Sequence, residues 1–114
     1  MNWFSQLPTT LQNSAFLYGE EAGWSRNAAL EVIKALSASG TVVLGVEVWL
    51  RSDGGPQIPT PYIYHWDSSA LNMPGATMAA VNAAAAQYIM RFEWDPLDVN
   101  MHTKEPYFNL SVAE

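Results

Sequence analysis

The ten residues 41–50, TVVLGVEVWL, form the strongest strand signal in the chain. β-Branched residues dominate them, and a glycine turn directly precedes them. Side chains in a strand alternate between two faces. One face here is uniformly aliphatic and is expected beneath helices, whereas the other is mixed, as is typical of a partly solvated antiparallel sheet. The aliphatic face is predicted to carry Val42, Leu44, Val46, Val48 and Leu50, and the mixed face Val43, Gly45, Glu47 and Trp49.

Two further segments have the periodicity of amphipathic helices. Apolar residues spaced by three and four predict a helix over 25–37 that Gly40 ends, and a longer helix over 76–94 that Asp95-Pro96 stops. The apolar positions are Ala29, Val32, Ile33 and Leu36 in the first helix, and Val81, Ala84, Ala85, Tyr88, Ile89 and Phe92 in the second.

Alternation also predicts strands over 62–67 and 107–112, the first forming a hairpin with 41–50 across a loop at 52–61. Residues 1–23 are less regular and predict only a short helix from Pro8 to Tyr18, broken by Gly19 and Gly23. We therefore expect an α+β fold in one domain over residues 1–114. It should have a three- to four-stranded, mainly antiparallel sheet with two or three helices packed on one face.

Composition narrows the classes of function. The chain has 114 residues, 49% of them hydrophobic, and a formal net charge of −6. It has no Cys, which excludes disulfides and thiolate metal sites. The excess of acid would repel nucleic acid and suits a basic protein partner, although it also serves solubility. The first residues do not resemble a signal peptide and no apolar run could span a membrane, so a cytoplasmic protein is expected.

Neither a metal site nor an active site has a specific motif. His65 and Asp67 share one strand face, but two ligands are too few for a metal, and we expect no cofactor. A small hydrolase that uses Glu47, His65 and Asp67 beside Ser68 or Ser69 is an alternative. It lacks a Gly-x-Ser-x-Gly elbow and predicts a pocket holding a carboxylate of raised pKa.

Aromatic residues are more informative, because the chain has five Trp and five Tyr. Tyr and Trp dominate the energetic centres of protein interfaces. We expect a partner-binding surface formed by Glu47, Trp49, His65 and Asp67, with Asp53 at its rim. Alternation puts Tyr64 and Trp66 on the opposite face of their strand, so they are the anchors if that strand is turned the other way.

The order of these segments resembles the immunity protein 40 family of bacterial polymorphic-toxin systems. The resemblance covers about residues 24–92. It rests on Trp24 with the 28–33 helix, the strand 43–49, the residues 64–67 and the late helix residues 86–92. It implies a non-enzymatic inhibitor of a toxin encoded beside it. Two departures are Val46 and Glu47, where the family typically has Gly and Asp. A structural or adaptor protein with a self-interface is a further alternative.

Overall fold

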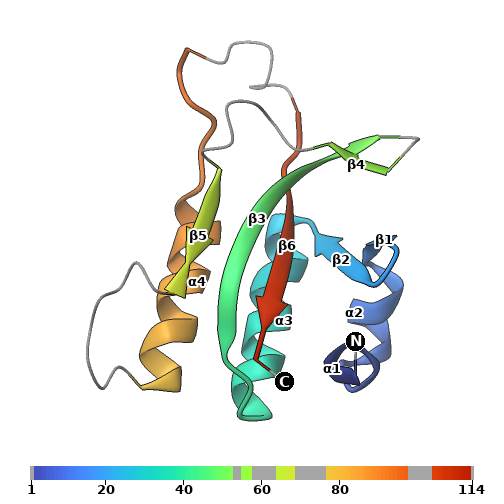
Figure 1. The fold of residues 1–114 in the computed structure, drawn as a ribbon, viewed down its shortest axis with the longest axis vertical. Coiled ribbons are helices and arrows are strands. Elements are labelled where there is room, and N and C mark those ends of the chain that lie inside the picture. Colours follow the sequence, from blue (N-terminus) through green and yellow to red (C-terminus); the bar gives the residue numbers. More distant parts are fainter. Residues whose placement is uncertain (1, 53–54, 58–63, 69–76, 98–103, 114) are drawn as a thin grey trace.

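The computed structural model describes residues 2–52, 55–57, 64–68, 77–97 and 104–113. The described chain is an α+β fold in which an antiparallel sheet is covered by helices on one face (Figure 1). Its helices are α1 (Asn2–Ser5), α2 (Thr9–Asn13), α3 (Arg26–Ala38) and α4 (Met78–Arg91). Its strands are β1 (Phe16–Tyr18), β2 (Glu21–Trp24), β3 (Val43–Ser52), β4 (Gly55–Gln57), β5 (His65–Asp67) and β6 (Tyr107–Val112).

The long strand β3 is the centre of the sheet. It pairs with β6 along one side and with β5 and β4 along the other, and all pairings are antiparallel. Strands β2 and β1 continue the sheet beyond β6. The expected α+β class is therefore confirmed, and so is the antiparallel pairing of 65–67 with 41–50. The expected number of three or four strands is too low.

Two of the additional strands, β1 and β2, come from the N-terminal segment. Residues 16–18, predicted as the end of a short helix, instead form β1, and helix α2 ends at Asn13. Gly19 has a φ of 60°, in the left-handed region, which allows a two-residue turn between Tyr18 and Glu21. Strand β4 is a second difference, because it lies inside the segment predicted as a loop.

Local signals explain where the two main helices begin and end. After α3, Gly40 adopts a φ of 77° and the N–H of Thr41 returns to the carbonyl of Leu36 at 2.9 Å, which closes the helix. The hydroxyl of Thr77 accepts from the N–H of Ala80 at 3.2 Å and caps the start of α4. No described helix is long and apolar enough to cross a membrane.

A β-bulge near the start of β3 changes which residues are buried. Val43 pairs with Val112 and Gly45 with Ser111, so Leu44 is an extra residue with no opposite partner. Val43 is fully buried while Leu44 is 42% exposed. The prediction that Leu44 is buried and Val43 faces outward is wrong, because the bulge reverses the alternation. Beyond the bulge, Val46, Val48 and Leu50 lie in the core as predicted.

The side-chain amide of Asn82 on α4 holds this bulge in place. Its Oδ1 accepts from the N–H of Val43 at 2.8 Å, and its Nδ2 donates to Ser37 Oγ and the carbonyl of Thr41, each at 2.9 Å. The amide is buried and thus connects α4, the end of α3 and the start of β3. Buried polar groups are stable only with such partners.

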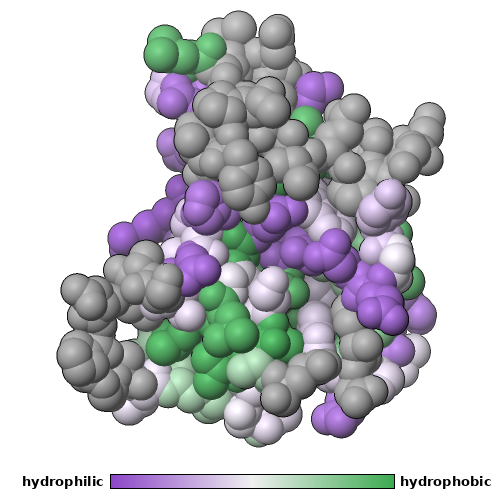
Figure 2. All heavy atoms as spheres, in the orientation of Figure 1, coloured by the Kyte–Doolittle hydropathy of each residue, from purple (hydrophilic) through white to green (hydrophobic). Residues whose placement is uncertain are grey.

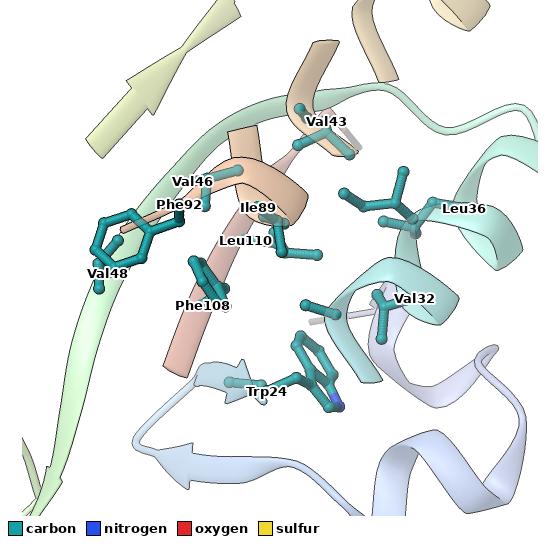
Figure 3. Packing of buried hydrophobic residues seen from close by; sticks show 14 of the residues in the cluster. Trp24, Val32, Leu36, Val43, Val46, Val48, Ile89, Phe92, Phe108 and Leu110 are labelled. Carbon is teal, nitrogen blue, oxygen red and sulfur yellow. The ribbon is translucent and has the colours of Figure 1, made fainter. Parts of the chain in front are cut away.

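The core lies between the sheet and helices α3 and α4 (Figure 3). Trp24 is fully buried at the end where the N-terminal helices pack. Its Nε1 donates to the carbonyl of Leu11 at 2.8 Å, and its ring centroid lies 6.0 Å from those of Trp3 and Phe4. Arg26 joins the two main helices by donating to the carbonyls of Met90 and Phe92, both at 3.0 Å.

The bulge can be tested with two adjacent substitutions. Val43→Ala should lower the free energy of unfolding by about 1.5 kcal/mol or more, since each buried methylene contributes about 0.8 kcal/mol. Leu44→Ala should change it by less than about 0.5 kcal/mol, as at other exposed positions. Urea unfolding followed by circular dichroism measures both, and a larger loss for Leu44→Ala would contradict the register described here.

Candidate functional site

Among the described residues, no helix lies on the face of the sheet opposite α3 and α4 over β3, β5 and β6, and we call it the uncovered face. Figure 2 shows this face in the orientation of Figure 1, and a band of hydrophilic residues crosses its middle above a hydrophobic area. The register places polar residues in neighbouring rows on this face. Glu47 lies between Asn109 and His65 in one row across the strands, and Gly45 lies between Ser111 and Asp67 in the next. Both rows point away from the helices.

A hollow of about 180 Å³ lies over Gly45. The hollow lies where Gly45 has no side chain between Ser111 on β6 and Asp67 on β5. Neighbouring strands are about 4.8 Å apart, so the two flanking residues stand about 10 Å apart. The hollow is lined by Glu21, Gly45, Val46, Glu47, His65, Trp66, Asp67, Asn109 and Ser111. Three of these residues are acidic and none is Lys or Arg.

The structure brings together three of the seven residues that the sequence predicts for the site, Glu47, His65 and Asp67. Glu47 and His65 are directly opposite each other on β3 and β5, and Asp67 is two residues further along β5. His65 and Asp67 are exposed, and Glu47 is half-buried. These three side chains share the hollow. Asp53 lies outside the described residues.

Trp49 lies on the same face, but it is not an exposed anchor. Only 2% of its surface is accessible. Its ring lies over Gly23, where an added Cβ would come within 2.9 Å of Trp49 Cε3, and Phe16 packs edge-on against it at 6.3 Å between centroids. Its Nε1 donates to Glu47 Oε1 at 2.7 Å. The protein's own residues thus cover the ring, and a contact of Trp49 with a partner stays a prediction.

Tyr64 and Trp66 belong to the other side of the sheet. Tyr64 is buried against Phe92 and Trp94, with centroid distances of 5.6 and 5.1 Å, and Trp66 is partly buried against the core. Burial, with a smaller contribution from Tyr64, raises the pKa of Tyr88 on α4 to about 12. That phenol is therefore protonated at neutral pH and cannot act as a base.

Three polar residues that line the hollow, Glu21, Asn109 and Ser111, were not predicted from the sequence. Asn109 and Ser111 occupy the polar positions of β6, and the alternation of that strand was a sufficient signal once its pairing with β3 was known. Glu21 lacked such a signal, because the hairpin that carries it was not recognised. Asn109 is buried and its Nδ2 donates to the carbonyl of Ala22 at 3.0 Å, which connects β6 to β2.

The chemistry of the hollow suits a cation. Among the described residues, no three His, Asp or Glu side chains are close enough to hold a metal ion. Three carboxyl groups spread around one depression can instead face a bulkier cation, such as the guanidinium of an arginine, which binds carboxylates through several N–H donors. Such a group could extend from a partner protein.

Comparison with known proteins gives no match to a family model, a curated protein or a solved structure.

The packing of Trp49 can be tested at a single glycine. Gly23→Ala should lower the free energy of unfolding by about 1–3 kcal/mol, the usual cost of overpacking, because the new methyl group would collide with the buried ring. Gly45→Ala is the matched control, since its Cβ would meet nothing closer than the carbonyl oxygen of Trp66 at 3.4 Å. Thermal and urea unfolding measure both, and equal losses would exclude a specific effect of Trp49.

Proposed function

We propose that this chain binds and neutralises a bacterial toxin domain, without catalysis, by holding a basic part of the toxin against the uncovered face of its sheet. The acidic hollow over Gly45 is the observation that carries this proposal. A net charge of −6 supports it, because opposite charges accelerate association. The order of segments that resembles the immunity protein 40 family supports the choice of a toxin as the partner.

The size of the hollow favours a protein over a free small molecule. Pockets for small ligands usually measure about 300–1,000 Å³ and enclose most of the ligand. This hollow holds about 180 Å³ and opens onto the face of a sheet. It is large enough for one side chain, which a surrounding interface would have to hold in place. The interface residues would then be Glu21, Glu47, His65 and Asp67, with Trp49 holding Glu47 through its indole N–H.

Co-expression tests the function directly. Wild-type protein should protect a sensitive bacterium from the toxin encoded beside it and should co-elute with that toxin from a sizing column. Absence of both protection and a complex would disprove toxin neutralisation. A column profile in which this chain alone elutes as a stable oligomer would instead support the alternative of a structural or adaptor protein with a self-interface.

Charge variants test the site. Glu21→Lys combined with Asp67→Lys should slow association with the toxin by about tenfold or more at low salt, because steering changes on-rates by about 10–1,000-fold, and the difference should shrink as salt is added. Glu31→Lys changes an exposed residue of α3 and is the control, which should leave the association rate nearly unchanged. Surface plasmon resonance measures the rates, also for Glu21→Lys and Asp67→Lys singly. If Glu31→Lys slows association as much as each of these single variants does, the effect is one of net charge alone.

A small hydrolase remains a second candidate, because Glu47, His65 and Asp67 do gather in one hollow that also contains the hydroxyl-bearing Ser111. We expect no turnover of model esters or phosphates by the purified protein. Glu47→Gln is the informative variant, since its amide oxygen can still accept from Trp49 while the charge is lost. Reproducible hydrolysis that Glu47→Gln or Ser111→Ala abolishes would replace the binding proposal with an enzymatic one.

A further inference from the structure

Strands β2 and β6 are paired only near one end. Among the described residues, their register comprises two pairs, Gly23 with Asn109 and Trp24 with Phe108. Beyond them β2 turns away toward its hairpin with β1, while β6 continues alongside β3 to Val112 (Figure 1). Residues 110–112 of β6 therefore have a described strand neighbour on the β3 side alone. The last part of β6 is an open edge inside the sheet.

The backbone groups of this edge have a defined direction. The N–H of Ala113 donates to the carbonyl of Val42, on the β3 side, at 2.9 Å. Because successive residues of a strand direct their N–H and C=O groups to opposite sides, those of Val112 and Leu110 point away from β3. They face the space left by β2. Such a row of donors and acceptors is a template for another strand.

The space beside this edge is hollow and acidic. A cavity of about 320 Å³ lies there, lined by Trp3 of α1, by Glu20 and Glu21 of the hairpin, and by residues 109–112 of β6. Its lining contains two carboxylates and no Lys, Arg or His. Ser111 points to the uncovered face of the sheet, the same side as Glu21. Val112 and Leu110 point to the helix side, where they pack against the core, as Trp3 does.

We infer that this wedge between β2 and β6 accepts an extended, basic segment of a partner protein, which adds to β6 as a short strand. Its main chain would pair with Leu110 and Val112. The residue opposite Ser111 would direct its side chain to the uncovered face, beside Glu21, and a Lys or Arg is complementary there. The residues before and after it would direct theirs to the helix side, beside Trp3. The preferred pattern is apolar, basic, apolar.

The wedge adjoins the acidic hollow, since Glu21, Asn109 and Ser111 line both. The identity of the protein that supplies the segment therefore rests on the proposed toxin-binding function. The capacity of β6 to pair with such a segment does not, because it follows from the edge and its charges. The two can be tested separately.

A synthetic peptide that alternates Val and Lys over seven residues, flanked by Thr, tests the wedge. Titration calorimetry should detect binding to the wild-type protein at physiological salt, and the amide of Val112 should become protected from hydrogen exchange. A peptide of the same composition with its Lys residues grouped together should bind at least about tenfold more weakly. No binding of the alternating peptide up to millimolar concentration would overturn the inference.

Variants locate the binding. Val112→Pro removes an N–H that faces the wedge, and Glu20→Lys reverses a charge that lines the wedge and not the hollow over Gly45. Each should lower the affinity for the alternating peptide by about tenfold or more. Glu31→Lys, with the same change of net charge, should not. If Val112→Pro lowers the melting temperature, its loss of peptide affinity could come from the fold, and Glu20→Lys is the deciding variant. Equal losses of peptide affinity in Glu20→Lys and Glu31→Lys would overturn the inference.

Asp67→Lys separates the two proposals, because Asp67 lines the hollow over Gly45 and not the wedge. It should leave the affinity for the alternating peptide within about twofold of wild type while slowing association with the toxin. Peptide binding by a wild-type protein that fails to protect against the toxin would support the wedge and disprove toxin neutralisation. Protection against the toxin by a wild-type protein that does not bind the peptide would support toxin neutralisation and disprove the wedge.

Discussion

The amide of Asn82 is the constraint on which the arrangement of the sheet depends. It accepts from the N–H of Val43 at the start of β3, and it donates to Ser37 near the end of α3 and to the carbonyl of Thr41 after that helix. One buried side chain thereby sets the distance between α4, α3 and β3. The bulge that it binds sets where the alternation along β3 shifts by one residue, and this shift buries both Val43 and Val46.

The outer face is shaped by a second contact, that of Trp49 with the backbone of β2. Gly23 leaves room for the ring, because a Cβ there would come within 2.9 Å of Trp49 Cε3, and Phe16 packs edge-on against it. A tryptophan in this position no longer offers a hydrophobic anchor to a partner. Its indole N–H instead orients Glu47 at 2.7 Å, which places a carboxylate at a defined position beside the hollow. The aromatic content of this face thus serves its own packing, and its lining around Gly45 is mainly polar.

Two features of the uncovered face share one cause, which is that β2 pairs with β6 only at Gly23 and Trp24 and leaves it toward Glu21. The hairpin carries Glu20 and Glu21 outward, so the acidic hollow acquires a rim and the edge of β6 becomes accessible. A partner that inserts a strand at this edge would bring its neighbouring residues directly over the hollow. Backbone pairing would then supply affinity, and the carboxylates would supply selectivity for basic side chains.

The sequence alone was sufficient for α3, α4 and the aliphatic part of β3 from Val46 onward, because periodic burial of apolar side chains is a local property of the chain. It also placed Glu47, His65 and Asp67 on one face, since strand alternation is equally local. The tertiary structure decided the exposure of Leu44, the burial of Trp49 and the contribution of Glu21. The exposure of Leu44 depends on Asn82, the burial of Trp49 on Gly23, and the place of Glu21 on the pairing of β2 with β6. These contacts join residues distant in sequence and leave no periodic pattern in it.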